Sequence, residues 1–342
     1  MVFDPRHSLW YGLGLTTVRL QTTPHVFMPV LSTPAHLLET RTRTRRCLVG
    51  GSGHAQRLVV GVDRIGYLVP RTDFRGHVHS VFEKSCNVAL DDRLLTICDS
   101  RAGEGPATLR LVGAGVGDLR IRFSAGESVD CCAGRMRSGR VDLQMCHASV
   151  WRPADPRPLL PPARIDAHLR NARARLALQR CTQPSIVNRE GAAVVAALMH
   201  AVHALDIGRA THGLDRLIGW GEGLTPAGDD FLVGLIAALN ALVQGDAPRR
   251  GFCGAIGLAI GSRIGRTTPI AAHYLQLAAG GHFTEPIVVV RDALLSEDQE
   301  WLVDAAVRRA LNIGATSGAD TLSGLLAGLH AWLSPHPMAL AA

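Results

Sequence analysis

A seven-residue pattern that occurs twice, 90 residues apart, constrains the fold more than any other feature of this chain. Residues 228–234 and 318–324 both read G-x-D-x-L-x-G, and both continue as Leu-(Ile/Leu)-Ala-x-Leu. The apolar residues recur at helical spacing, and glycines and alanines form a second stripe that lets another backbone approach closely. We predict two helices packed side by side, with their N-termini close together.

The residues before each copy carry signals for the start of a helix. Thr225 and Pro226 follow a glycine-rich loop, and they predict an N-cap and a first helical residue. Thr316 offers the same kind of cap before the second copy. A third helix start, at Thr268 and Pro269, lies between the two copies and could complete the same pocket.

Two helix N-termini at one spot would bring unpaired backbone N–H groups and positive dipole ends together, which favours an anion site. The alternative is that the aspartates only complement the helix dipoles and the glycines only allow tight packing. The candidate catalytic residues are Asp229, Asp230 and Asp320. The candidate substrate-binding residues at these helix starts are Gly221, Gly223, Leu224, Thr225, Gly228, Arg266, Thr267, Thr268, Thr316, Ser317 and Gly318.

The rest of the chain predicts an α+β fold, in which a β-rich N-terminal domain, either an antiparallel sheet or a small barrel, precedes an all-helical C-terminal domain. We expect a loosely ordered extension over residues 1–46, the β-rich domain over 47–150, a proline-rich connection over 151–162 and the helical domain over 163–335. The expected strands are 58–62, 67–69, 78–82, 94–98, 107–112, 119–123 and 141–145. The expected helices are 163–181, 189–206, 226–244, 251–262, 269–280, 286–294, 298–312 and 317–333.

Composition removes several classes of function. The chain of 342 residues has a net charge of +7, yet Lys84 is its single lysine, so a G-x-x-x-x-G-K-[ST] phosphate loop is absent. The aromatic content of 5% argues against a nucleic-acid surface that works by base stacking. The eight cysteines form no C-x-x-C pair, and no apolar run approaches the length of a membrane span, which favours a reducing cytoplasm.

Metal-ligand spacing is also missing from the sequence. Neither of the two close histidine pairs belongs to an H-E-x-x-H pattern, and the adjacent Cys131 and Cys132 are expected to point to opposite faces of a strand. We therefore assign no metal ligand and expect no obligatory cofactor. Mg²⁺, held through water by Asp229 or Asp230, is the one candidate ion.

The chain resembles a bacterial family of unknown function in three segments, GWGEGLTPAGDDFLVG, RTTPIAAHYL and IGATSGADTLSGLLAGL. That family includes the H subunit of oxamate carbamoyltransferase from allantoin degradation, and the similarity spans residues 58–333. Asn87 and the GEGP run at 103–106 resemble weaker family positions in the β-rich half. The sequence departs from the family pattern at Ala315, where a histidine is usual, which puts a proton-transfer role at that position in doubt.

The resemblance implies a subunit that works with an acyl-CoA-synthetase-like partner and a third subunit. Together they would pass a carbamoyl group between oxalurate and phosphate, giving oxamate and carbamoyl phosphate. The expected ligand is then a small anionic metabolite, such as phosphate, carbamoyl phosphate or a carboxylate. The alternative is a non-catalytic module that binds an anionic metabolite or stabilises a partner, since no triad of nucleophile, base and orienting group is legible.

Overall fold

The computed structural model describes residues 57–91, 93–99, 103–112, 117–182 and 189–334. These described residues belong to one compact unit. The expected extension over residues 1–46 lies outside the described residues. Among the described helices, none is long and apolar enough to cross a membrane.

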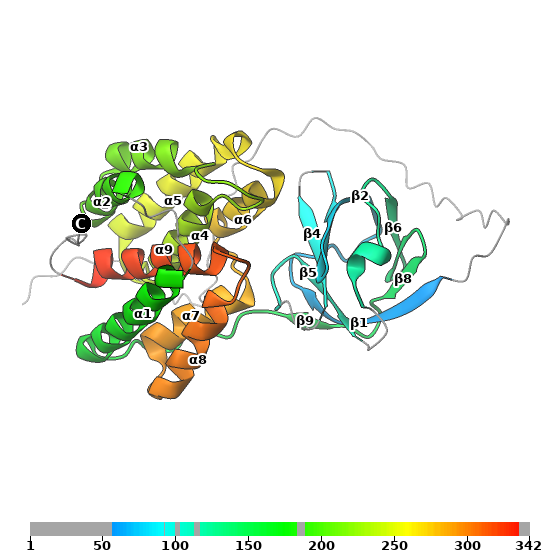
Figure 1. The fold of residues 1–342 in the computed structure, drawn as a ribbon, viewed down its shortest axis with the longest axis horizontal. Helices are drawn as coiled ribbons and strands as arrows, with labels where there is room; N and C mark the ends of the chain where they lie inside the picture. Colours follow the sequence, from blue (N-terminus) through cyan, green and yellow to red (C-terminus); the bar gives the residue numbers. More distant parts are fainter. Residues whose placement is uncertain (1–56, 92, 100–102, 113–116, 183–188, 335–342) are drawn as a thin grey trace, which may run out of the picture. The chain divides into compact units, whose positions relative to one another are not determined.

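The β-rich part is a closed barrel (Figure 1). Eight strands follow one another around it in the order β1-β5-β4-β3-β2-β6-β7-β8, and β8 pairs again with β1. The short β9 runs parallel to the last part of β1 and extends the sheet. The described strands are β1 (Leu58–Gly66), β2 (Phe74–Val81), β3 (Ser85–Ala89), β4 (Leu94–Cys98), β5 (Thr108–Val112), β6 (Ser128–Cys132), β7 (Arg135–Ser138), β8 (Val141–Gln144) and β9 (Ser149–Trp151).

The barrel confirms the β-rich half of the predicted fold and corrects details of it. Pairing is mixed, because β1 runs parallel to β8 and β4 runs parallel to β5. The stretch expected as a strand at 119–123 instead begins with the short 3-10 helix η1 (Leu119–Ile121), since the Asp118 side chain accepts a hydrogen bond from the Arg120 N–H and turns the chain. Alternation holds in β6, where Cys131 is buried and Cys132 is exposed.

Alternation also decides what the β3–β4 hairpin presents on its two faces. Cys86 and Ile97 point into the barrel core. Asn87 and Thr96 lie opposite each other in the register of the two strands and face the other side. This outer face forms one wall of the site described below.

The remainder of the described chain is all-helical, as predicted. Nine α-helices are described: α1 (Pro162–Thr182), α2 (Arg189–His203), α3 (Ile207–Leu217), α4 (Ala227–Ala241), α5 (Ala247–Gly261), α6 (Pro269–Ala279), α7 (Glu285–Ser296), α8 (Glu300–Leu311) and α9 (Ser317–Leu333). A 3-10 turn, η2 (Ile264–Arg266), precedes α6. The sequence prediction missed α3, which Asp206 starts by accepting a hydrogen bond from the Arg209 N–H.

The two copies of the repeated pattern form α4 and α9, which lie side by side (Figure 1). Their contact is reciprocal. A Cβ added at Gly234 of α4 would lie 1.9 Å from the Thr321 carbonyl oxygen, and one added at Gly324 of α9 would lie 1.8 Å from the Phe231 carbonyl oxygen. Because Gly234 and Phe231 correspond in the repeat to Gly324 and Thr321, the pair has approximate two-fold symmetry. The predicted pairing of these two helices is confirmed.

Candidate functional site

A glycine-rich loop leads into α4. Gly219, Gly221 and Gly223 all have positive φ, at 77°, 116° and 95°, a region that favours glycine. Close approach adds a second requirement at Gly219, since an added Cβ would lie 2.4 Å from the Arg266 carbonyl oxygen. The loop therefore takes its path because of these glycines, and Gly221 and Gly223 lie exposed on it.

Asp229 holds this loop in place. Its side chain is 1% exposed, and Oδ1 accepts a hydrogen bond of 3.0 Å from the Gly219 N–H. Oδ2 accepts a short hydrogen bond from the Thr267 hydroxyl. Burial raises the pKa of the Asp229 carboxyl, and these two hydrogen bonds oppose that shift. Both oxygens are thus occupied by protein groups, which favours a structural role for Asp229.

The starts of α4 and α9 meet directly. The Thr225 hydroxyl and the Ser317 hydroxyl are 2.9 Å apart. Thr316 occupies the cap position of α9, as predicted, but makes no side-chain cap hydrogen bond, and the predicted cap at Thr225 is wrong because Pro226 takes the cap position of α4. Thr225 instead turns toward the neighbouring helix start. The predicted proximity of the N-termini is therefore correct, although its local chemistry differs.

A cavity of about 390 Å³ adjoins the meeting point of these helices. The barrel contributes Phe82, Ser85, Asn87, Thr96, Cys98, Gly103, Glu104 and Thr108 to its lining. The helical part contributes Leu224, Thr225, Asp230, Val233, Ile270, Tyr274, Thr284, Pro286, Ile287, Ile313, Gly314, Ser317 and Thr321. Hydroxyl groups dominate the polar lining. The charged side chains among these described residues are the carboxyls of Asp230 and Glu104.

Asp230 is strongly perturbed by its surroundings. Its Oδ2 atom is buried without a hydrogen-bond partner. Burial raises the pKa of the Asp230 carboxyl to about 7, and the nearby charges of Asp320 and Asp229 push it in the same direction. Hydrogen bonding from the Ser317 and Thr225 hydroxyls lowers the pKa in part. A carboxyl with such a pKa exchanges protons in the neutral range and is suited to acid–base chemistry.

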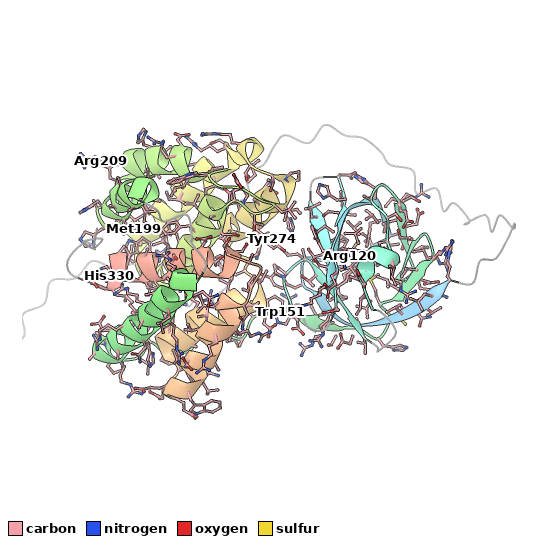
Figure 2. All side chains as sticks on the ribbon, viewed as in Figure 1. Arg120, Trp151, Met199, Arg209, Tyr274 and His330 are labelled. Carbon is pink, nitrogen blue, oxygen red and sulfur yellow. The ribbon has the colours of Figure 1, made fainter. Side chains whose placement is uncertain are left out.

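Asn87 and Tyr274 belong to a polar chain on the opposite wall. The Thr96 hydroxyl donates to Asn87 Oδ1 at 2.9 Å, and Asn87 Nδ2 donates to the Ser80 hydroxyl at 3.0 Å. The Tyr274 hydroxyl hydrogen-bonds the Thr96 side chain. Tyr274 lies on α6 (Figure 2), and burial together with the charge of Asp230 raises its pKa. These bonds fix the orientation of the Asn87 amide.

Two further groups from the barrel are not reactive as they stand. Burial raises the pKa of the Cys98 thiol to about 12, and this thiol donates to the Gly103 carbonyl oxygen at 3.4 Å, so it is not a thiolate nucleophile at neutral pH. Glu104 is 8% exposed and is held by a short ion pair to Arg110 and a longer one, of 3.4 Å, to Arg64. The negative charge of Glu104 is therefore balanced by these two arginines.

The structure places several predicted site residues outside the cavity lining. Arg266 binds the Asp215 carboxylate at 2.7 Å, on the side of the loop where Gly219 and Trp220 line another depression. Arg266 therefore lies outside the lining of the pocket that it was predicted to complete. The others that do not line the cavity are Asp229, Asp320, Gly221, Gly223, Gly228, Thr267, Thr268, Thr316 and Gly318.

Packing explains most of these residues. Cβ atoms added at Gly228 and Gly318 would each lie 2.1 Å from a carbonyl oxygen of the preceding helix, Leu217 and Ala310 respectively. Thr268 caps α6, because its hydroxyl oxygen accepts from the Ala271 N–H at 3.1 Å. The contacts of these glycines and of Thr268 therefore favour the structural alternative, in which the glycines allow tight packing and Thr268 caps a helix.

The prediction placed Asp230, Thr225, Leu224 and Ser317 in one pocket, and the structure brings them together with Asn87. Sequence reasoning missed the residues that only folding delivers, chiefly Thr96, Tyr274 and Thr321. Thr321 stands inside the repeated pattern, and Tyr274 stands inside the RTTPIAAHYL segment, so both carried a usable signal. Over the described residues, no group of three or more His, Cys, Asp or Glu side chains could hold a metal ion.

Comparison with known proteins adds two matches in the described parts of the chain. Residues 58–150 match the N-terminal domain of the AllH family, and residues 217–329 match the family of oxamate carbamoyltransferase subunit AllH. The two matches together cover more than half of the chain and include both walls of the cavity. No solved structure matches the chain. The chain therefore belongs to the AllH family of oxamate carbamoyltransferase subunits.

Proposed function

We propose that this chain is the substrate-binding subunit of an enzyme complex that transfers a carbamoyl group between oxalurate and phosphate, forming oxamate and carbamoyl phosphate. The family name supports a subunit of such a complex. The observation that carries the assignment of the site is the position of Asp230, which lines the cavity where α4 and α9 begin and whose buried Oδ2 has no hydrogen-bond partner.

The two walls suit the two ends of such a substrate. A carbamoyl or amide group offers N–H donors and a carbonyl acceptor, which a carboxyl and the hydroxyls of Thr225 and Ser317 can meet. The fixed amide of Asn87 offers a donor and an acceptor from the opposite wall. Asp230 is the candidate catalytic residue in this arrangement, and it orients the substrate amide.

The anion site belongs to the start of α9 in this proposal. At the start of α4, the Gly228 N–H already donates to the Trp220 carbonyl oxygen, and the Asp229 and Asp230 N–H groups donate to Pro226. At α9, the Gly318 and Asp320 N–H groups also donate to backbone carbonyl oxygens, those of Ile313 and Thr316, but Gly314 and Ser317 bring this helix start to the cavity lining. The dipole of α9 would therefore stabilise the substrate carboxylate, at about 0.3–1 kcal/mol for an exposed site and more in a buried one.

Calorimetric titration of the purified chain tests this proposal. Oxamate, oxalurate, carbamoyl phosphate and phosphate are added separately, with and without Mg²⁺. We expect binding of a carbamoyl-bearing or oxamate-type ligand at micromolar strength, which corresponds to about −8 kcal/mol. The Asp230→Asn variant should lose at least tenfold in affinity for that ligand.

Glu300→Gln is the matched control, because Glu300 is an exposed carboxylate in the first turn of another helix, α8. It should leave the affinity unchanged. Equal weakening by both substitutions, or no binding by the folded chain and by its complex with the partner subunits, would contradict the proposed site. Binding without turnover by the complete complex would favour the alternative, a non-catalytic module that binds the metabolite.

A further inference from the structure

The two-fold relation between α4 and α9 gives Asp230 a counterpart. In the repeat, Gly228-Asp229-Asp230 corresponds to Gly318-Ala319-Asp320, so Asp230 and Asp320 occupy equivalent places at the paired helix starts. Their surroundings differ. Asp230 lines the cavity, whereas Asp320 is 1% exposed and is not part of the lining.

A half-buried arginine, Arg180, contacts α9 close to Asp320. Arg180 reaches α9 from α1, where its Nη2 donates to the Ser323 hydroxyl, and Ser323 lies one turn after Asp320. The charge of Asp320 interacts with the Arg180 guanidinium, which burial otherwise disfavours as a cation. Arg180 therefore supplies a positive charge near Asp320, and it does not line the cavity.

We infer that Asp230 and Asp320 act as one carboxyl pair that holds a single proton, with the proton on Asp230 and with Asp320 kept ionised by Arg180. Asp230 and Asp320 each lie one turn before the glycine at which α4 and α9 touch, Gly234 or Gly324, and the hydroxyls of Thr225 and Ser317 at these helix starts are 2.9 Å apart. Two carboxyls so placed, where solvation is poor, cannot both be charged without a large penalty. A pair with unequal surroundings divides the roles, so that one member is an acid and the other stays an anion.

The groups that face Asp230 from each packed element agree with this division. Asp229 on its own helix and Asp320 on α9 are the acids whose charges raise its pKa, and Tyr274 on α6 interacts with it as a further acidic group. The hydroxyls of Thr225 and Ser317 complete its surroundings. The described groups that shift its pKa thus include no cation that would hold Asp230 ionised.

This inference deepens the proposed function and rests on it for the chemistry. The carbamoyl carbon of oxalurate gains a bond to a phosphate oxygen and loses its bond to nitrogen. Asp230 gives its proton to that nitrogen, which leaves as the amide of oxamate. The proton of the attacking phosphate restores Asp230, so that atoms and charge balance. Asp320 and Arg180 act as positioning residues in this step.

Infrared difference spectroscopy of the chain in D₂O tests the pair without any ligand, through the C=O band of a protonated carboxyl. We expect such a band below neutral pD. Its midpoint should lie near the pKa of the Asp230 carboxyl, which is about 7. Asp230→Asn should remove the band. Asp320→Asn should keep it but lower its midpoint by about one unit or more, because the neighbouring negative charge is gone.

Two arginine variants separate positioning from folding. Arg180→Met should leave Asp320 without its cation, so that a second carboxyl is protonated in the neutral range, whereas Arg180→Lys should restore the single band. Circular dichroism verifies that each variant is folded. The inference is wrong if the folded wild-type chain shows no protonated carboxyl between about pD 5 and 7, or if the band survives Asp230→Asn.

The pH dependence of ligand binding distinguishes this inference from the proposed function. If Asp230 binds oxamate as an acid, affinity should fall about tenfold per pH unit above the midpoint, and Asp320→Asn should shift that fall to lower pH. A titrating band with no binding of oxamate or oxalurate by the complete complex would support the pair and contradict the proposed function. A pH profile of binding that stays the same in Asp230→Asn and in Asp320→Asn would contradict the proposed carboxyl pair.

Discussion

The two copies of the repeat share one backbone arrangement but differ in the role of their helix starts. Gly234 and Gly324 make the same contact from opposite sides, and Gly228 and Gly318 each pack against the carbonyl oxygen of a preceding helix. The copies diverge at the next position, where the first has Asp229 and the second has Ala319. Symmetric packing therefore fixes where the helices start, and the residues outside the shared pattern decide which start faces a ligand.

The largest expected effect comes from breaking the shared contact. Gly324→Ala places a Cβ 1.8 Å from the Phe231 carbonyl oxygen, so α4 and α9 must move apart, at a cost of at least about 3 kcal/mol. Gly254→Ala on α5 is the control, because an added Cβ there meets nothing within 4 Å. It should stabilise the chain by up to about 1 kcal/mol. Urea unfolding measures both, and equal effects would contradict the packing argument.

A smaller effect should follow from making the first copy like the second. Asp229→Ala leaves the Gly219 N–H and the Thr267 hydroxyl without their acceptor, which should reduce the free energy of unfolding by about 2 kcal/mol. Thermal or urea unfolding would show the loss. Glu300→Ala, at an exposed carboxylate, should change stability by less than about 0.5 kcal/mol. A neutral outcome at Asp229 would mean that the loop does not depend on it.

The pH dependence of stability separates the two copies further. The folded-state pKa of Asp230 is raised to about 7 from the ordinary carboxyl value of 3.8, so the folded chain binds one more proton than the unfolded chain between these values. Stability should therefore fall as pH rises, by about 1 kcal/mol between pH 6 and pH 7 from this group. Asp230→Asn should remove this slope in urea unfolding at the two pH values. An unchanged slope would assign it to another group.

The smallest effects concern the caps. Thr268→Ala removes an acceptor for the Ala271 N–H at the start of α6 and should cost about 1 kcal/mol. Thr316→Ala removes a side chain that caps nothing at the start of α9, so it should cost no more than a few tenths of a kcal/mol. Comparison of the two melting temperatures tests the distinction. A larger loss at Thr316 would show that it caps α9 in solution.

The sequence predicted the parts of this molecule that local pattern controls. Repetition of G-x-D-x-L-x-G was enough to pair α4 with α9, because glycine at this spacing has few other uses in a helix. The cap at Thr225 was wrong because the Thr225 hydroxyl bonds Ser317 on the neighbouring helix, whereas Thr316 holds the predicted cap position without a cap hydrogen bond. The placement of Asp230 in the cavity followed from the pairing of the helices.

The other wall of the cavity depended on long-range structure. Thr96 and Asn87 meet because β3 and β4 pair in that register, and Tyr274 reaches them from α6, some 180 residues farther along the chain. No local spacing encodes that approach. Arg266 was predicted as a site residue because it precedes a helix start in the sequence. In the structure, an ion pair with Asp215 on α3 holds it outside the cavity lining. The missed helix α3 therefore also explains the misplaced arginine.

Turnover by the complete complex tests the central claim most directly. Formation of carbamoyl phosphate from oxalurate and phosphate is measured with this chain and its partner subunits, and then with Asp230→Asn or Glu300→Gln in its place. The account predicts that Asp230→Asn lowers the rate at least a hundredfold, as expected for loss of an acid–base group, while the complex still assembles and Glu300→Gln keeps full rate. Full turnover by an assembled Asp230→Asn complex would contradict it.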